Sequence, residues 1–490
     1  MSTSINDERS VRIKKMSELR SLGIDPYSSV APREDSVTIA LKKSEGAIVS
    51  LAGRLMSKRD IGKITFSHLQ DESGRIQIAW KEDVLGKDNY ALFLHAIDTG
   101  DILWIRGERF VTKAGEESVL VCEWRILTKA ILPLPDKYHG LQEEELRLRK
   151  RYLDFIMDTD KRKIFYRKAM FWNSMRQFLL EEGFLEVETP VLETTAGGAD
   201  ATPFTTHHHA LDIDVYLRIS MGELWQKRLM VGGFEKTFEI GRQFRNEGMS
   251  REHLQDYTQM EFYWAYADYT SGMGMVERMY KEVIQKTFHT LVFDIGDFKG
   301  IDLAKSWDRI DYVETIKKKT GIDVLTAEND AMKQTLKKLK IAFDETLEKG
   351  RLIDLLWKYC RKSIAGPVFL IHHPVLVSPL AKRCLHNPAL TERYQIIIAG
   401  SELGNGYSEL NDPLDQTERF EEQGKMREKG DIEAQMHDHD FVEALEHGMP
   451  PTTGFGVSER LFAFLENASV RECVLFPLVR PGEHENKSSV

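Results

Sequence analysis

Residues 238–261, FEIGRQFRNEGMSREHLQDYTQME, join two strand-like runs through a long charged connection. The first run begins at Lys236 and becomes polar at Arg242, and the second run covers residues 257–265. Two apolar runs on either side of a charged turn are typical of paired strands. This stretch therefore predicts an antiparallel hairpin.

The connection of this hairpin carries side chains that suit a nucleotide. Arg245 offers a planar fork of donors that matches a phosphate, Glu247 can accept from an exocyclic amine, and Tyr257 can stack on a base. His253 lies in the same connection, and Gly248 allows the backbone to turn. A hairpin whose charged loop is merely solvated is the alternative, because charged loops are common.

Residues 244–248, FRNEG, followed by His253 and by residues 257–261, YTQME, resemble motif 2 of the class II aminoacyl-tRNA synthetases. The resemblance is greatest to the lysyl-tRNA synthetases, and the aspartyl and asparaginyl enzymes are the nearest relatives. It extends from about residue 10 to about residue 480 and so covers nearly the whole chain. It implies an α+β fold, in which an N-terminal OB-fold β-barrel precedes a class II catalytic domain made of an antiparallel sheet flanked by helices.

The size of the chain agrees with several domains. A length of 490 residues exceeds what one hydrophobic core usually supports, and 42% hydrophobic with 29% charged residues is an ordinary globular composition. We expect an N-terminal helical extension (1–44), an OB-fold anticodon-binding domain (45–135) and a catalytic domain (136–490). Within the last, residues 270–380 resemble the variable insertion of class II enzymes.

Short alternating apolar runs separated by glycines occupy residues 47–127. Five such runs predict a small closed barrel. On one face of such a barrel an aromatic ring can stack on an unpaired base while Arg, Gln and Glu read base edges. The positions that match the anticodon-reading residues of the lysyl-tRNA synthetases are Arg59, Phe66, Gln77 and Glu123. A barrel whose polar surface does nothing specific is the alternative.

Further motifs of the class follow along the chain. Residues 183–190, GFLEVETP, are similar to motif 1, which forms the dimer interface in the family. Residues 197–199, GGA, match a loop beside the substrate's amino group, and residues 218–225, RISMGELW, resemble an RIxxEL segment with one additional residue before Glu223. Residues 454–461, GFGVSERL, resemble motif 3, but the third glycine is missing and the run is one residue short.

Residues 393–412, RYQIIIAGSELGNGYSELND, carry the last group of polar side chains. Glu402 and Glu409 are seven residues apart, which on a regular strand places them on opposite faces. A bulge at the intervening glycines would bring both into one cleft. The family usually has a second acid where Gln395 stands, and an amide offers a magnesium ion an oxygen but no charge. This departure bears on the affinity for magnesium.

The resemblance implies roles for individual residues. The implied catalytic residues are Arg245, Arg460 and Glu402. The implied amino-acid-binding residues are Gly198, Glu223, Arg245, Glu261, Tyr263, Asn405, Tyr407 and Glu409. The implied ATP-binding residues are Arg245, Glu247, His253, Tyr257, Glu402 and Arg460. The implied cofactor is Mg²⁺, with Glu402 as its ligand, and ATP is a co-substrate.

The activity that the resemblance implies is ATP-dependent ligation of lysine to its tRNA. Lysine and ATP would give lysyl-adenylate and pyrophosphate, and the lysyl group would then pass to the 3′ end of lysine tRNA. A synthetase of the aspartyl or asparaginyl type is one alternative, because it shares the motifs. A nucleic-acid-binding homologue that has lost catalysis is another, because Gln395 and the short motif 3 depart from the family. No Rossmann fingerprint or Walker loop occurs in the sequence.

The expected partners are lysine tRNA, ATP, L-lysine and a second copy of the chain in a homodimer. With a net charge of −10, tRNA binding needs local basic patches, and residues 147–168 hold nine Lys or Arg against three Asp. A solvated helix face explains the same charges. The longest apolar runs fall short of the roughly 18 residues of a membrane span, and the four cysteines are scattered singly. We therefore expect no membrane association and a cytoplasmic location.

Overall fold

The computed structural model describes residues 5–135, 143–248, 250–429 and 434–480. Its contacts divide the chain into two compact units, Met1–Thr159 and Asp160–Val490. The start of the catalytic domain that the sequence predicts, residue 136, lies outside the described residues. Each unit has its own apolar core, and none of the described helices is long and apolar enough to cross a membrane.

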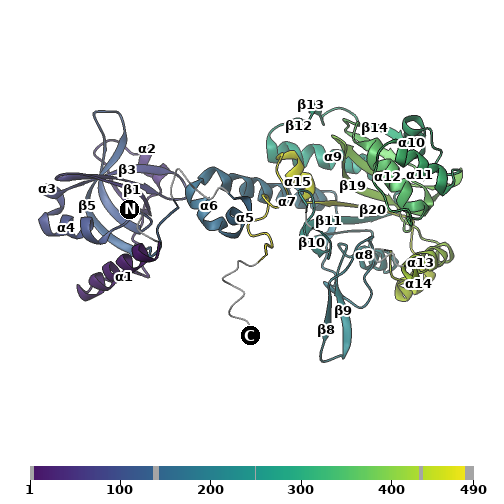
Figure 1. The fold of residues 1–490 in the computed structure, drawn as a ribbon, viewed down its shortest axis with the longest axis horizontal. Helices are drawn as coiled ribbons and strands as arrows, with labels where there is room; N and C mark the ends of the chain where they lie inside the picture. The colour runs from purple at the N-terminus through teal and green to yellow at the C-terminus, as the bar shows by residue number, and fades with distance from the viewer. Residues whose placement is uncertain (1–4, 136–142, 249, 430–433, 481–490) are drawn as a thin grey trace. The chain divides into compact units, whose positions relative to one another are not determined.

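Five strands close into a barrel in the first unit (Figure 1). In spatial order the strands are β1 (Ile48–Ile61), β2 (Ile64–Gln70), β3 (Arg75–Lys81), β5 (Glu117–Thr128) and β4 (Ile102–Val111). Only the β3–β5 pair among these is parallel. Each strand contains one of the apolar runs seen in the sequence, so the predicted barrel is confirmed. A five-stranded barrel of this kind is an OB-fold.

The first unit also contains helices. They are α1 (Ile5–Ser21), α2 (Val37–Lys42), α3 (Glu82–Leu85), α4 (Lys87–Ala96), α5 (Glu144–Arg149) and α6 (Arg151–Met157). α4 follows β3 and closes the core, because Phe93 stacks on Trp80 with the ring centroids 3.8 Å apart. Helix α1 is held by Arg12, which donates to the carbonyl oxygens of Thr99 and Ala130 at 3.0 and 3.1 Å.

A buried ion cluster joins α1, the end of α4 and the end of β5. The Nζ atom of Lys129 lies 2.6 Å from Asp98 and 2.8 Å from Asp101, and it donates to the carbonyl oxygen of Ala96. Asp98 also pairs with Lys15 of α1 at 2.6 Å. Burial raises the pKa of Asp101, against the lowering effect of Lys129. Each buried charge in this cluster is therefore stabilised by a partner of opposite sign.

An eight-stranded sheet organises the second unit. In spatial order its strands are β14 (Asp308–Asp311), β15 (Val368–Ile371), β18 (Arg393–Ile398), β19 (Ser401–Ser408), β20 (Thr452–Ser458), β11 (Asp256–Ala265), β10 (Lys236–Phe244) and β6 (Leu185–Glu186). The strands from β15 to β10 are antiparallel, and the outer pairs β14–β15 and β10–β6 are parallel. β10 and β11 are the hairpin predicted from residues 238–261.

Helices cover both faces of this sheet. One face packs on α7 (Lys163–Glu181) and α9 (Tyr269–Phe288). The other face meets α8 (Glu223–Val231), α13 (Pro413–Glu428) and α14 (His439–Glu446) (Figure 1). The short helix α15 (Arg460–Leu465) follows β20 directly. The α+β fold expected from the sequence is therefore confirmed.

Residues 270–380 differ from the expected insertion, because part of this stretch belongs to the central sheet. α9 packs on the sheet through Val276, Met279 and Val283, and β14 and β15 extend its edge. The helices α10 (Tyr312–Thr320), α11 (Asn329–Lys338) and α12 (Lys349–Arg361) form a cluster with an apolar core of its own. Strands of four residues, such as β14 and β15, are too short to show a period in the sequence.

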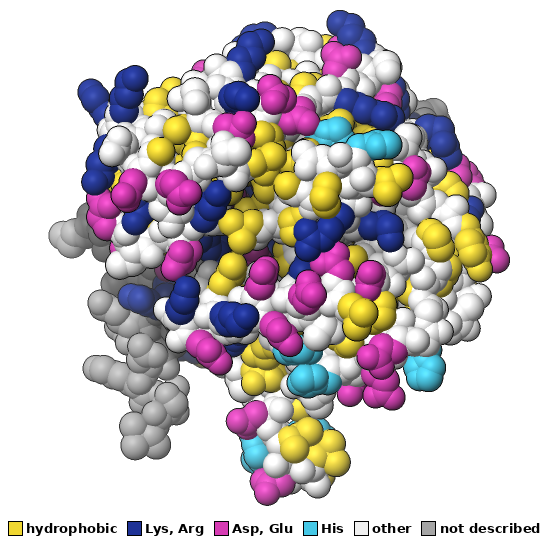
Figure 2. Space-filling view, turned by 90° about the vertical axis from the view of Figure 1, so that its right-hand side faces the viewer, with side chains coloured by type: hydrophobic (Ala, Val, Ile, Leu, Met, Phe, Trp, Pro, Cys, Tyr) yellow, Lys and Arg dark blue, Asp and Glu magenta, His cyan; other side chains and the backbone are white. Residues whose placement is uncertain are grey.

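Three small sheets complete the second unit. They are β7 (Leu192–Glu193) with β9 (Ile213–Leu217) and β8 (Thr205–His208), β12 (Val292–Ile295) with β13 (Phe298–Asp302), and β16 (Arg383–Cys384) with β17 (Asn387–Thr391). The β8–β9 hairpin projects from the unit in Figure 1, and Figure 2 shows the same projection at its lower edge with hydrophobic, acidic and histidine side chains mixed at its surface.

Replacing Lys129 with Met should lower the free energy of unfolding of the barrel by about 3–5 kcal/mol, because it leaves Asp101 buried without its cation, whereas Asp98 keeps Lys15. Native-state hydrogen exchange at the β4 and β5 amides of the full chain measures this change. The control is Lys63→Met, because the Lys63 side chain is 87% exposed and forms a single long ion pair, 3.6 Å from Glu82. Its effect should stay within about 0.5 kcal/mol. Equal effects of the two variants would contradict a stabilising role for the cluster.

Candidate active site

A cavity of about 390 Å³ opens on the sheet face opposite α7 and α9. It is built by alternation along the strands: Met260 and Phe262 of β11 face the apolar core, while Gln259, Glu261 and Tyr263 line the cavity. On β20, Gly454 and Gly456 line the cavity, and the side chain of Phe455 packs in the core but also reaches the cavity, because neither glycine has a side chain to cover it. The polar face of the hairpin thus becomes one wall of a pocket.

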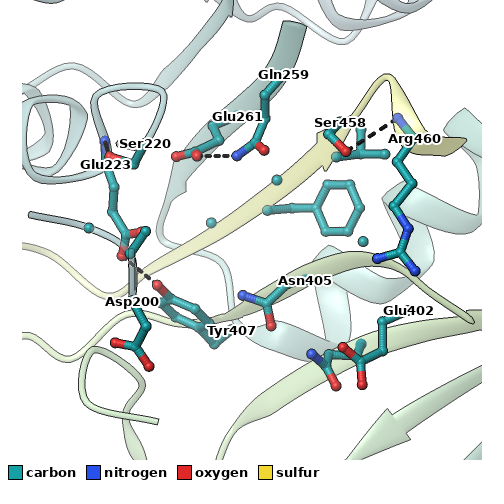
Figure 3. A pocket seen from close by; sticks show the side chains of 18 of the residues that line it. Asp200, Ser220, Glu223, Gln259, Glu261, Glu402, Asn405, Tyr407, Ser458 and Arg460 are labelled. Carbon is teal, nitrogen blue, oxygen red and sulfur yellow. Dashed lines mark hydrogen bonds between the residues drawn. The ribbon is translucent and has the colours of Figure 1, made fainter. Parts of the chain in front are cut away.

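The cavity collects nearly all of the residues predicted from the sequence. The lining residues among them are Gly198, Glu223, Arg245, His253, Tyr257, Glu261, Tyr263, Glu402, Asn405, Tyr407, Glu409 and Arg460. Glu247 is the exception: it is half-buried and lies outside the lining, although it is close enough to influence the pKa values of His253 and Tyr257. Figure 3 shows Glu223 and Tyr407 on one side of the pocket and Glu402 with Arg460 on the other.

The bulge predicted between Glu402 and Glu409 is present in β19. Gln395 of β18 pairs with Asn405, and Ile397 pairs with Glu402, so three steps on β19 face two steps on β18. The extra residue puts Glu402 and Glu409 on the same cavity. Gly404 allows this path, because a Cβ atom there would lie 2.7 Å from Phe455 and from the Tyr280 hydroxyl.

Three buried carboxylates form one end of the cavity. Glu261 accepts hydrogen bonds from the Met221 amide at 3.1 Å, the Tyr263 hydroxyl at 3.0 Å and the Gln259 amide at 2.5 Å. Glu223 accepts from the Tyr407 hydroxyl, which Figure 3 marks with a dashed line. Glu409 reaches the same end because Gly454 has no Cβ; one there would lie 2.2 Å from the Glu409 Oε1 atom.

Lys227 of α8 lies behind these carboxylates, and the sequence analysis did not identify it. Its Nζ atom is 2.7 Å from Glu223 and 2.6 Å from Glu409, and the side chain is 1% exposed. Burial alone would lower the pKa of Lys227, but the ion pairs with Glu223 and Glu409 raise it. Glu223 and Lys227 are four residues apart, a spacing that in sequence is typical of a solvated helix pair.

Burial dominates the titration of the acidic end. Burial, together with the charge of Glu223, raises the pKa of Glu261 to about 7, against three hydrogen bonds that lower it. Burial also raises the pKa of Glu409 to about 8, against the attraction of Lys227. One ammonium group thus does not neutralise three carboxylates, and the ligand-free pocket retains protons near neutral pH.

The opposite end of the cavity is basic. Arg245 donates to the carbonyl oxygen of Ile219 at 3.3 Å and lies 5.8 Å from the centre of the Tyr257 ring. Arg460 begins α15 and pairs with Glu252. Burial and the nearby Arg460 lower the pKa of His253. Two guanidinium groups at one end and three carboxylates at the other suit a ligand with phosphates at one end and cations at the other.

Glu402 and Gln395 have partners of their own. The Trp357 indole donates to Glu402 at 2.6 Å, and Arg361 lies 3.5 Å from the same carboxylate. His373 lies 3.0 Å from the Gln395 amide oxygen. Sequence reasoning missed these three partners, because Trp357 and Arg361 come from α12 and His373 is the second residue after β15, where no motif is present. Among the residues that the structure describes, no group of three or more His, Cys, Asp or Glu side chains is placed to hold a metal ion.

In the barrel, strand register places Arg59 opposite Phe66 and Gln77 opposite His68, two residues from Phe66. These three side chains therefore share the outer face. A register shift at Cys122 lets Glu123, opposite Arg106, point outward as well, while Val121 remains in the core. Gln77 also bonds to Glu116 at 2.6 Å and to Ser118 at 2.8 Å.

Known proteins resemble both units. Residues 143–480 match the family of class II tRNA synthetases (D, K and N), and residues 49–127 match the OB-fold nucleic acid binding domain. A protein of Thermoanaerobacter sp. named "Lysine--tRNA ligase" is 44% identical over 485 residues, 97% of each chain. Proteins of the same name from Thermotoga maritima and Staphylococcus saprophyticus are each 42% identical, over 98% of this chain and 97% and 100% of theirs.

Glu261 should make stability depend on pH. The folded protein keeps its proton up to about pH 7, whereas the unfolded chain loses it near pH 4.5, so stability is lost as pH rises through this window. The variant Glu261→Gln should match the wild type at pH 4.5 and be more stable by about 2–3 kcal/mol at pH 8. Chemical denaturation across this range, with the exposed Glu188→Gln as control, tests this. A difference that does not change with pH would contradict it.

Proposed function

This chain belongs to the class II tRNA synthetases, and we propose that it is a lysine--tRNA ligase, which activates L-lysine with ATP and transfers the lysyl group to the 3′ end of lysine tRNA. The observation that carries the proposal is the cluster of Glu223, Glu261 and Glu409 at one end of the cavity. A pocket with this charge attracts an amino acid with an additional ammonium group. An aspartate side chain would be repelled there, because the cation described at this end, Lys227, is already paired with two carboxylates.

The same cavity supports catalysis of adenylate formation. The reaction is an in-line attack of the lysine carboxylate on the α-phosphorus of ATP, which needs aligned reactants and neutralised charge rather than a protein nucleophile. In our proposal Arg245 bridges the carboxylate and the α-phosphate, and His253 and Arg460 hold the outer phosphates. Tyr257 stacks on the adenine. Because Arg245, Arg460 and Glu402 all line the cavity, a homologue without catalysis is disfavoured.

The substrate amino acid lies at the acidic end in this proposal. Gly198, which has a φ of +85° and no room for a Cβ beside Ser220, admits the α-amino group next to Glu223 and Glu261. Asn405 and Tyr407 of β19 flank the aliphatic part of the side chain, together with Tyr263 of β11, which lies on the other side of β20. Glu409 then meets the terminal ammonium group.

Magnesium fits the basic end of the cavity. Mg²⁺ is commonly held by one or two carboxylates together with substrate phosphates. Glu402 supplies the carboxylate and Gln395 an amide oxygen, both on the cavity lining. When bound, the ion neutralises charge on the ATP phosphates. Arg361 lies 3.5 Å from Glu402 and adds positive charge to this end of the cavity. The family usually has a second acid at this end, in the position of Gln395.

A homodimer is the assembly that we propose. β6 forms one edge of the central sheet, and a sheet edge with apolar side chains tends to pair with another chain. Met170 and Leu180 of α7, Leu185 of β6 and Leu192 of β7 are exposed apolar residues in this part of the unit. Leu185 lies in the segment similar to motif 1, and the other three residues lie before or after it. A second copy would cover them.

A cytoplasmic location agrees with the cysteines. Cys122, Cys360, Cys384 and Cys473 are all free thiols. Proteins of reducing compartments usually retain free thiols, whereas disulfides accumulate in secreted proteins. The division into residues 1–44, 45–135 and 136–490 remains our proposal for the functional modules, with tRNA bound by the second and third.

Amino-acid-dependent exchange between ATP and pyrophosphate tests the proposed activity directly. Lysine should support exchange, whereas aspartate and asparagine at the same concentration should not, because they bring no second cation to the acidic end. Omitting tRNA isolates this first step. Exchange driven by aspartate or asparagine would contradict the choice of substrate, and failure with every amino acid would favour a homologue without catalysis.

Replacing Phe66 with Ala should impair tRNA recognition alone. The outer face that carries Arg59, Phe66, Gln77 and Glu123 is our proposed anticodon site, and stacking on an aromatic ring contributes about 1–3 kcal/mol per base. At limiting tRNA, aminoacylation should therefore fall by a factor on the order of 5 to 150 at 25 °C. Pyrophosphate exchange serves as the internal control. Equal losses in both assays would argue against a separate role for the barrel.

A further inference from the structure

The acidic end of the cavity contains a residue whose position no substrate contact explains. Lys227 does not line the cavity, and its side chain is 1% exposed. Its Nζ atom instead contacts Glu223 of α8 and Glu409, the residue after β19, at 2.7 and 2.6 Å. The aromatic rings of Tyr407 and Phe441 lie 5.4 and 5.8 Å from the same nitrogen. Lys227 is thus enclosed by the two carboxylates that form the cavity wall.

We propose that Lys227 is a positioning residue that sets the amino-acid preference of this pocket: it holds Glu223 and Glu409 together and leaves a deficit of two positive charges for the substrate to fill. This inference rests on the proposed lysine-activating function. The substrate class it defines is an amino acid with two ammonium groups.

The deficit follows from the side chains at this end of the cavity. When ionised, Glu223, Glu261 and Glu409 carry three negative charges, and Lys227 carries one positive charge. In the ligand-free pocket bound protons offset part of this difference, and a cationic ligand displaces them.

Burial keeps the pKa of Tyr263, Tyr394 and Tyr407 well above its ordinary value, so these hydroxyls are neutral. Asp200 and Arg393 also line the cavity and carry opposite charges, so together they leave this balance unchanged. A dibasic amino acid supplies the two missing charges. A neutral amino acid supplies one and leaves a buried carboxylate unpaired, which is costly.

Lys227 also explains why Glu223 and Glu409 can lie so close together. Two carboxylates that contact one nitrogen are close enough to repel each other strongly, and burial strengthens that repulsion. Without a shared cation they would separate or share a proton, as paired buried carboxylates do. With Lys227 in place, both face the cavity and are ready to accept an ammonium group. The cation therefore acts through the two carboxylates rather than on the substrate itself.

The variant Lys227→Met, which keeps the length of the side chain and removes its charge, tests the proposal. In lysine-dependent pyrophosphate exchange by the full chain, its kcat/KM for lysine should fall at least tenfold at pH 7, mainly through KM. The pH at which kcat/KM for lysine is half-maximal should rise by at least one unit, because the carboxylates then hold their protons more tightly. The KM for ATP should change by less than about threefold. A loss of stability alone would not shift the pH midpoint.

Two further variants complete the test. Lys227→Arg retains the charge and should keep the pH midpoint of the wild type. Lys236→Met removes another half-buried lysine of this unit, which donates to the Glu182 carbonyl oxygen away from the cavity, and should leave the lysine profile unchanged. An unshifted midpoint in Lys227→Met, or a shift of equal size in Lys227→Arg, would overturn the proposal.

If Lys227→Met does not fold, Glu223→Gln decides the question. Removing one of the three carboxylates reduces the deficit to a single positive charge, so the preference for lysine over norleucine, measured as the ratio of kcat/KM, should fall at least tenfold. An unchanged ratio would overturn the proposal. Wild-type exchange with lysine separates the two levels of inference. If the wild type does not exchange with lysine, the proposed function fails; if it does and the variants behave as the wild type, only the role of Lys227 fails.

Discussion

Along β11, successive side chains point to opposite faces of the sheet, and the second unit depends on this alternation. Met260 and Phe262 pack against α7 and α9, while Glu261 and Tyr263 point into the cavity. A shift of one residue in the pairing with β10 or β20 would bury the Glu261 carboxylate in the apolar core and turn the Phe262 ring toward the cavity. The register that stabilises the core is therefore the register that builds the site. Folding and binding are specified by the same hydrogen-bonded ladder.

Glycines and one bulge adapt this regular sheet to a ligand. Gly454 makes room for the Glu409 carboxylate, and Gly456 lies next to Glu261, where a Cβ would approach its Cγ to 3.1 Å. The extra residue in β19 turns Glu402 to the same side as Asn405. Motif 3 thus contributes more than contact with a nucleotide, because its glycines let acids of neighbouring strands enter the cavity. Ser458 occupies the position of the missing third glycine, and its hydroxyl oxygen accepts a hydrogen bond from the Arg460 backbone amide at 3.3 Å.

The sequence predicted the elements that are long and periodic. The barrel strands and the hairpin at residues 238–261 are present, because each combines a clear apolar period with a distinct end. Features that depend on distant partners were missed. The sequence analysis did not single out Lys227, because only the fold places Glu409 beside it, and β14 and β15 are too short to recognise. Glu247 was expected in the pocket, but the turn after β10 leaves it outside the lining.

The two ends of the cavity handle buried charge in opposite ways. At the acidic end, every carboxylate receives donors or a cation, yet one ammonium group against three acids leaves the end negative. At the basic end, Gln395 is neutral and Arg361 stands beside Glu402, so the balance there is positive. His373, which contacts Gln395, adds no charge, because burial lowers its pKa well below the ordinary value. Each end thus keeps an excess of charge that only a ligand of opposite sign can relieve. Such an excess costs stability in the empty protein, but it aligns a molecule that carries ammonium groups at one end and phosphates at the other.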